Sequence, residues 1–258
     1  MRFKIILFEL LIVFFLFSGS VLADTFELLV KQGDLFHANF MNVEALEKYQ
    51  KAYEIKPDSF EILKKLTLTS NDCGEDQVEI NEEKAKEYFS MSVKYAELAK
   101  EKFPDEAEVY LLLGLSYGNS SRYAGGKKRI KLARDVEKNF KEIIKLKPDY
   151  APPYIGLGIY YREVSKLNFF LKLFAKRFLG GLPNGSLEDS ETMLIRAVEL
   201  APDKVFTHYE LAITYLDMSD TEKVKYHLEK VLELPDTDHL DPLKKKTAMK
   251  ILADFNPK

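Results

Sequence analysis

Apolar and small residues recur along the chain at a spacing that predicts pairs of helices. A large residue is followed three positions later by Leu or Gln, then directly by a small residue, and three positions further on by an aromatic or small polar residue. Positions three and four apart share one face of a helix, so each copy predicts a helix with one packing face. Five copies of the pattern begin at Leu29, Leu63, Tyr110, Tyr154 and His208.

Four prolines give this pattern its period. Each lies ten residues before the small residue of the next copy: Pro57 before Thr67, Pro104 before Gly114, Pro148 before Gly158 and Pro202 before Ala212. A proline cannot continue a helix, so it begins the next unit. The small residue allows the second helix of each unit to approach closely. The repeating element is therefore a helix pair.

The pattern resembles the tetratricopeptide repeat, whose first helix reads aromatic-x-x-Leu-Gly-x-x-Tyr. The resemblance predicts an all-α fold over residues 24–258, an α-α superhelix of about five helix pairs. The interval from the small residue to the next proline is 24 residues in the first copy and 37, 34 and 44 in the following three. We expect the extra residues to form insertions between the two helices of a unit. Asp241 as N-cap and Pro242 as first helical residue predict a capping helix that ends near Phe255.

Residues 1–23 differ from the rest of the chain. Arg2 and Lys4 precede an apolar run that is interrupted only by Glu9, and small residues lead to Ala23. This is the pattern of a secretory signal peptide cleaved after Ala23. The alternative is an uncleaved membrane anchor, for which the apolar run is short. We expect an exported protein that is soluble in the periplasm.

Composition limits the function classes. The chain has 258 residues, of which 46% are hydrophobic and 31% charged, as in a globular protein. Without its first 23 residues it keeps 36 basic and 40 acidic residues, a net charge of −4. That charge gives no reason to expect a nucleic-acid partner. The single cysteine, Cys73, cannot form an internal disulfide.

No arrangement of residues typical of an enzyme is found, and we expect neither catalysis, nor a cofactor, nor a metal. Residues 125–128 lack the spacing and the hydroxyl residue of a phosphate-binding loop. Three aspartates surround His239 and suggest a cation site, but a polar turn before a helix is the simpler interpretation. Residues 72–76 are interpreted in the same way, as a solvated loop between helices.

The last three copies are apolar on more than one face. Their expected inner positions are apolar, whereas those of the first two copies are mostly polar, and a helix that is apolar all round is buried on all sides. We therefore expect a ligand- or partner-binding surface on the concave side, formed with two residues of an insertion at 163–185. Its candidate residues are Leu111, Leu115, Ile155, Ile159, Phe170, Phe174, Phe206, Tyr209, Ile213 and Leu216.

There are three alternatives for what covers this apolar surface: a segment of the chain itself, a bound ligand or partner, or a membrane. The insertion at 163–185 has apolar residues at helical spacing and basic residues between them, so it is able to fold back over the groove. An apolar small molecule or a helix of a partner is the second candidate. In the third, the basic amphipathic insertion lies on a membrane surface.

Residues 147–234 resemble the T-component family of TRAP transporters, most specifically in Leu179-Gly180-Gly181-Leu182-Pro183-Asn184-Gly185-Ser186-Leu187-Glu188. Ser186 is placed to cap the helix that follows. The resemblance implies a trimeric periplasmic accessory protein with an apolar cavity, which pairs with a solute-binding protein and helps to deliver an organic acid or a hydrophobic solute. Asp24 stands where lipoproteins of that family carry cysteine. The eukaryotic regulators of microtubule dynamics have a similar glycine-rich insertion, but the secretory signal argues against their role.

The sequence thus predicts a non-catalytic accessory subunit for solute uptake. The rival hypothesis is an envelope scaffold that joins proteins through its insertions and holds no small ligand.

Overall fold

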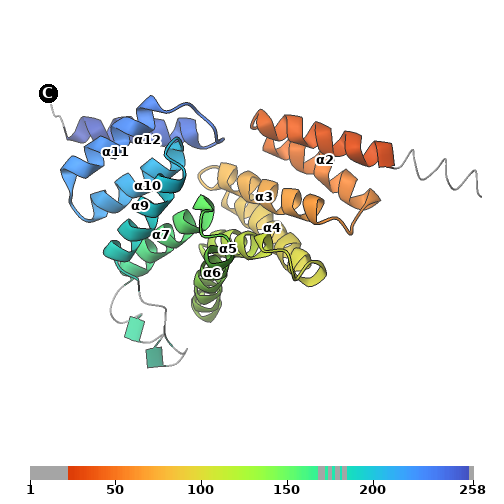
Figure 1. Cartoon of the computed structure of the whole chain (residues 1–258), viewed down its shortest axis with the longest axis horizontal. Helices are drawn as coiled ribbons and strands as arrows, with labels where there is room; N and C mark the ends of the chain where they lie inside the picture. The colour runs from red at the N-terminus through yellow and green to blue at the C-terminus, as the bar shows by residue number, and fades with distance from the viewer. Residues whose placement is uncertain (1–22, 168–171, 174–175, 178–180, 182–184, 256–258) are drawn as a thin grey trace, which may run out of the picture.

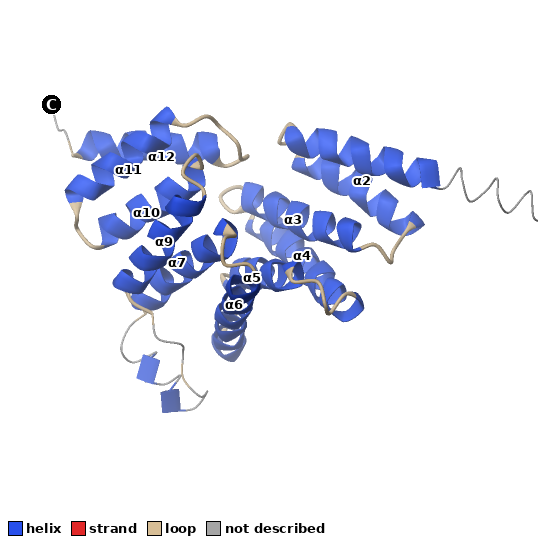
Figure 2. Ribbon diagram, viewed as in Figure 1, coloured by secondary structure: helices blue, strands red, loops and turns tan. Residues whose placement is uncertain are grey.

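The computed structural model describes residues 23–167, 172–173, 176–177, 181 and 185–255, and all regular structure within these ranges is helical (Figures 1 and 2). A helix over residues 23–38 comes first. The elements that follow are α2 (Asn42–Ile55), α3 (Phe60–Gln77), α4 (Glu82–Lys102), α5 (Glu108–Ser121), α6 (Gly126–Leu146), α7 (Ala151–Ser165), α9 (Leu187–Leu200), α10 (Val205–Asp217), α11 (Thr221–Glu233) and α12 (Asp241–Asp254). No helix in these ranges has both the length and the apolar character needed to span a bilayer.

The helices form the expected α-α superhelix. Helix 23–38 and α2, α3 and α4, α5 and α6, α7 and α9, and α10 and α11 make five units, and α12 packs against α10 and α11 as the capping helix. The first helices of successive units, α3, α5, α7 and α10, contact one another and form the inner layer. Figure 1 shows the units following one another along a strongly curved path.

The small residues of the repeat allow the two helices of a unit to touch, as predicted. A Cβ atom added at Gly33 would lie 2.4 Å from the ring of Tyr49, and one at Gly114 would lie 2.5 Å from the ring of Phe140. At Gly158 the nearest atom, from Leu194, would be 2.4 Å away. Real side chains do not approach so closely, so only glycine fits where the aromatic or leucine side chain crosses.

The prediction of insertions between the two helices is wrong for the second and third units. The extra residues there lengthen the helices: α3 has 18 residues, and α4 and α6 have 21 each, against 14 in α2. Residues 72–76, interpreted from the sequence as a loop, belong to α3 because Gly74 packs against Phe89 of α4. Only the fourth unit has an insertion between its helices, at 166–186, and most of its residues lie outside the described part of the chain.

Local capping decides where several helices begin. Ser186 accepts a hydrogen bond from the backbone N–H of Asp189, whose carboxylate accepts from the Ser186 N–H, so the expected cap is a complete capping box. Asp241 is not an N-cap as predicted. It is the first residue of α12, and its carboxylate accepts from the N–H groups of Thr237 and Asp238 in the preceding turn.

The curvature brings the last unit back to the first two. The loop between α11 and α12 reaches the C-terminal end of α3, where His239 Nδ1 lies 2.7 Å from Asp76 Oδ1. These residues are 163 positions apart in the sequence. Figure 1 shows this loop, in blue, facing the near ends of the first helices, in red and orange. The superhelix therefore nearly closes on itself.

Candidate functional site on the inside of the superhelix

The structure buries the predicted apolar residues to different degrees. Leu111 is buried in the core between α5, α6 and α7, and Leu115, Ile155 and Tyr209 pack partly against the neighbouring cores. Ile159, Phe206 and Ile213 are half-buried, and Leu216 is 39% exposed. Phe170 and Phe174 lie outside the described residues. The partly exposed members therefore concentrate on α7 and α10.

A buried ion pair crosses the same two helices. Arg162 of α7 donates from Nη2 to Glu210 Oε2 of α10 at 2.6 Å and from Nη1 to the Glu210 carbonyl oxygen at 2.9 Å. The two residues are only 6% and 8% exposed. The Nε donor of Arg162 has no hydrogen-bond partner within the described part of the chain. A second pair, Lys166 to Asp217 at 2.8 Å, lies at the more exposed end of the same helices.

The capping helix contributes a third buried charge. Lys244 of α12 is 7% exposed, and its Nζ lies 4.4 Å from the centroid of the Phe206 ring. Burial lowers the pKa of Lys244, while the charges of Glu210 and Glu75 oppose that shift. One of the predicted apolar residues, Phe206, is therefore covered by a cation of the same chain, and the inner surface is more polar than expected.

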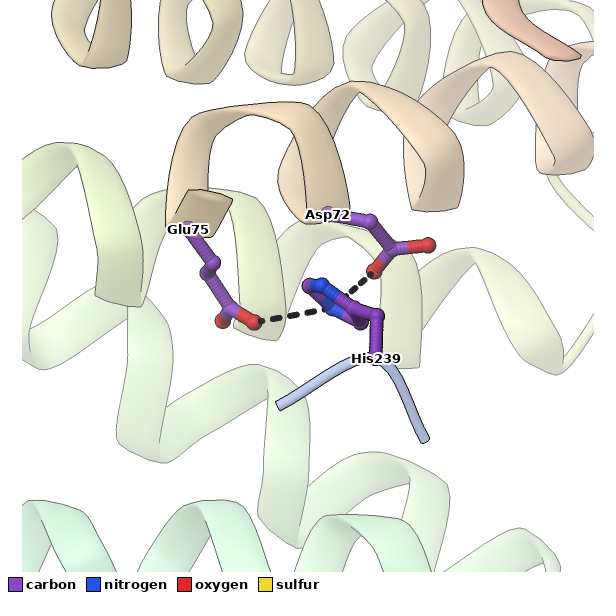
Figure 3. Close-up of side chains that lie close together, drawn as sticks. All are labelled: Asp72, Glu75 and His239. Carbon is purple, nitrogen blue, oxygen red and sulfur yellow. Dashed lines mark ion pairs between the residues drawn. The ribbon is translucent and has the colours of Figure 1, made fainter. Parts of the chain in front are cut away.

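A second cluster of charges lies where the superhelix closes. Asp72 and Glu75 are three residues apart on α3 and share one face of that helix, and His239 approaches them from the loop before α12 (Figure 3). His239 Nε2 lies 3.7 Å from Asp72 Oδ1 and 3.7 Å from Glu75 Oε2. These three side chains are the group among the described residues whose atoms are close enough to hold one metal ion.

The protonation of this cluster is strongly perturbed. Burial, and next the charge of Asp72, raise the pKa of Glu75 to about 7. Burial of His239 opposes its charged form, but the hydrogen bond to Asp76 and the charge of Asp72 outweigh it and raise the pKa of His239 to about 9. Perturbed ionisable groups in contact are typical of functional sites.

Of this cluster the sequence pointed only to His239, and it favoured a polar turn over a cation site with Asp236, Asp238 and Asp241. These carboxylates serve the loop itself: Asp236 pairs with Lys245 at 2.6 Å, and Asp238 accepts from the Leu240 N–H. The partners of His239 are instead on α3. The available signal was the i, i+3 spacing of Asp72 and Glu75, which becomes informative once residues 72–76 are known to be helical.

A cavity of about 370 Å³ adjoins the cluster. It lies between the end of helix 23–38, the start of α2, α3 and the loop before α12, and Asp72 and His239 are part of its wall. Phe40 also lines it, with a left-handed backbone φ of +60° that costs a bulky residue free energy. The closure of the superhelix thus provides a polar hollow with one strained aromatic residue at its edge.

The fold defines the class of this protein, a tetratricopeptide-type helical-repeat protein. Its structure is similar to the crystal structure of a thermophilic TPR protein of Thermus thermophilus, with a TM-score of 0.65. The match covers 87% of this chain and 99% of that chain at 18% sequence identity. At that identity the likeness establishes the fold alone.

The sequence comparison gives the family. The family model of regulator of microtubule dynamics protein 1-3 matches residues 29–256, and the chain belongs to that family. It is similar to human regulator of microtubule dynamics protein 2, with 23% identity over 180 residues, 69% of this chain and 44% of the human protein. Bos taurus regulator of microtubule dynamics protein 1 is 24% identical over 241 residues, 92% of this chain and 74% of the bovine protein.

Of the two families that the sequence resembles, the transporter T-components and the regulators of microtubule dynamics, the family match supports the second. The family that matches is the regulators of microtubule dynamics, which the signal-like N-terminus had argued against, and not the transporter T-component family. Both share tetratricopeptide-type helices, and the glycine-rich stretch at 179–188 was not specific enough to separate them. Residues 1–22, which carried that argument, lie outside the described structure.

Proposed function

We propose that this protein is a non-catalytic adaptor that binds an amphipathic segment of a partner protein on the inner face of α7 and α10. The observation that carries the proposal is the group of partly exposed apolar side chains, Ile159, Ile213 and Leu216, beside the Arg162–Glu210 pair. Apolar anchors with charges at their edge are typical of peptide-binding grooves.

Charge at the edge of this surface defines the partner further. Glu163, Lys166 and Asp217 are ion-paired at the ends of α7 and α10, and the first of these side chains is 61% exposed. Such edge charges fix the orientation of a bound segment more than its affinity. The partner is therefore a segment with apolar residues for the groove and polar residues, some basic, for the edge.

Site-specific photo-crosslinking tests this proposal. A photoreactive amino acid at Leu216 is expected to give one defined protein adduct in cells of the source organism. The matched control places it at Leu232, which is 37% exposed on α11, outside the inner layer. Equal adducts from both positions, or none from Leu216, contradict the proposal.

The names of the relatives suggest a specific partner. They are called regulators of microtubule dynamics, and this role comes to the present chain as a proposal. Co-sedimentation of the purified protein with stabilised microtubules tests it. Pelleting that is lost in Ile159→Asp and Ile213→Asp, with their helical content retained, supports binding through the inner face. Pelleting that is unchanged in both variants places the contact elsewhere.

The N-terminal pattern favours a second candidate function. Arg2 and Lys4, the apolar run and Ala23 are the basis for proposing an exported accessory subunit of a solute-uptake system. In that case the mature protein begins at Asp24, and native mass spectrometry shows a bound apolar small molecule or a solute-binding protein. An intact N-terminus in protein isolated from cells contradicts it.

A further inference from the structure

Three potential ligand atoms converge at the closure of the superhelix. Asp72 Oδ1, Glu75 Oε2 and His239 Nε2 face one another, with the nitrogen 3.7 Å from each oxygen (Figure 3). That distance is too long for a hydrogen bond. None of the three atoms makes a hydrogen bond to another described residue, although a charged neighbour is close.

The other polar atom of each side chain is already held. Asp72 Oδ2 lies 2.8 Å from His37 Nε2, and Glu75 Oε1 accepts from Asn119 Nδ2 at 3.2 Å. His239 Nδ1 lies 2.7 Å from Asp76 Oδ1, and Asp76 is fixed in turn by a hydrogen bond of 2.9 Å from Asn42. The carboxylate behind the imidazole is the usual outer partner of a metal-binding histidine, because it orients the ring and leaves Nε2 free to coordinate.

We propose that Asp72, Glu75 and His239 form a binding site for one divalent transition-metal ion such as Zn²⁺. Two ligands about 2.0–2.2 Å from a tetrahedral zinc lie roughly 3.3–3.6 Å apart, so the two nitrogen–oxygen distances of 3.7 Å need little adjustment. The imidazole nitrogen favours Zn²⁺ and similar ions over Ca²⁺ and Mg²⁺, which prefer oxygen ligands alone. Asp72 and His239 line the cavity, from which water completes the coordination.

The electrostatics of the cluster support a bound cation. Asp72, Glu75 and Asp76 bring three carboxylates within reach of one imidazole. Without a metal, positive charge comes from a protonated His239, from His37 beside Asp72 at 2.8 Å and from Lys244 acting on Glu75, and the ion must displace the His239 proton to reach Nε2. The alternative to a metal site is therefore a metal-free cluster whose carboxylates are balanced by protonated His239 and His37 and by Lys244.

A metal ion here would join distant parts of the chain. Two of its ligands are on the second unit and the third is on the loop that precedes the capping helix. Binding would tie the end of the superhelix to its beginning and fix the shape of the inner face. This role goes beyond the proposed partner binding and does not depend on the identity of the partner.

Calorimetric titration of the purified, chelator-treated full chain with ZnCl₂ tests the site. We expect one ion per chain, with Mg²⁺ and Ca²⁺ binding far more weakly. Glu75→Gln and His239→Gln should each weaken Zn²⁺ affinity at least about tenfold. Glu79→Gln, an exposed neighbour just beyond α3, is the matched control and should bind like the unmodified chain. Cys73→Ala should also bind normally, because the thiol is buried in the hydrophobic core.

The outcomes decide between the alternatives. Circular dichroism of each variant checks that the helices are retained, so that lost binding is not lost folding. The proposal is overturned if Zn²⁺ does not bind saturably, if Glu75→Gln and His239→Gln leave affinity unchanged, or if Cys73→Ala abolishes binding. Equal affinity for Mg²⁺ would overturn the choice of ion. Any of these results leaves the partner-binding proposal intact, because that surface is on α7 and α10.

Discussion

Two buried histidines in the last unit make the stability of this protein depend on pH. His208 of α10 and His227 of α11 face each other with their Nδ1 atoms 2.9 Å apart. His208 Nε2 lies 2.9 Å from the carbonyl oxygen of Pro202, which can only accept, so this nitrogen carries the proton. Nδ1 of His208 is then the acceptor for the Nδ1–H of His227. This hydrogen bond requires a neutral His208, because its Nδ1 accepts, and a proton added to His227 goes to Nε2 of a buried ring.

The size of the effect follows from the pKa of His227. Burial, followed by the nearby His208 and Lys223, lowers it from 6.5 to about 4. The unfolded chain therefore takes up a proton near pH 6.5, whereas the folded chain resists protonation until about pH 4. The contribution of neutral His227 to the free energy of unfolding is fully present above pH 6.5 and is lost as the pH falls from 6.5 to about 4. A shift of 2.5 units corresponds to about 3 kcal/mol, and His227 is only 9% exposed, so solvent screens little of it.

Urea denaturation followed by circular dichroism measures this loss. Between pH 7 and pH 4 the His227→Asn variant should lose about 3 kcal/mol less free energy of unfolding than the unmodified chain. Protonation of Glu75, whose pKa is raised to about 7, stabilises the fold over the same interval, but it does so in both proteins and cancels in the comparison. Asparagine keeps a neutral donor near the position of Nδ1 and does not titrate. Identical pH profiles for the two proteins would refute the reasoning. An unchanged dependence on urea concentration is the control for two-state unfolding.

Three further predictions concern packing, charge and backbone conformation. In thermal melts, Gly114→Ala should lower the free energy of unfolding by about 1–3 kcal/mol, because the added methyl group overpacks the contact with Phe140. Gly118→Ala is the control: its added methyl group would have no contact shorter than 3.9 Å, so it should be neutral or stabilising. Arg162→Met should lower the free energy of unfolding by about 3 kcal/mol, because it leaves Glu210 buried and unpaired. Combining Arg162→Met with Glu210→Leu should restore part of this free energy, as measured by urea denaturation. Ser219→Gly should raise the melting temperature by relieving a φ of +63°; an unchanged melting temperature would contradict that explanation.

The sequence was sufficient for the repeated unit because each unit is specified locally. The spacing from proline to small residue identified the helix pairs, and Gly33, Gly114 and Gly158 occupy the predicted points of close approach. Ser186 was correctly placed as a cap because its bonds reach only to Asp189. The lengths of α3, α4 and α6 were missed because a longer helix and an inserted loop both add residues between the same two markers.

The candidate sites were predicted less completely than the repeated unit, because they depend on contacts between different repeats. An apolar inner face was expected from helices that are apolar all round, but Lys244 covers Phe206 from another helix, which no spacing within one repeat reveals. His239 was noticed beside its own aspartates, while the atoms that face it belong to Asp72 and Glu75. Both errors concern contacts between residues far apart in the sequence.

The amino-acid sequence by itself determined the helices, their pairing and their order, because these depend on side chains within one or two turns or one repeat. The tertiary structure alone decided how far the superhelix curves. That curvature is the sum of the small rotations between successive units, and it carries His239 across 163 residues to the end of α3. The cluster at the closure exists only because those rotations bring the two ends of the superhelix together.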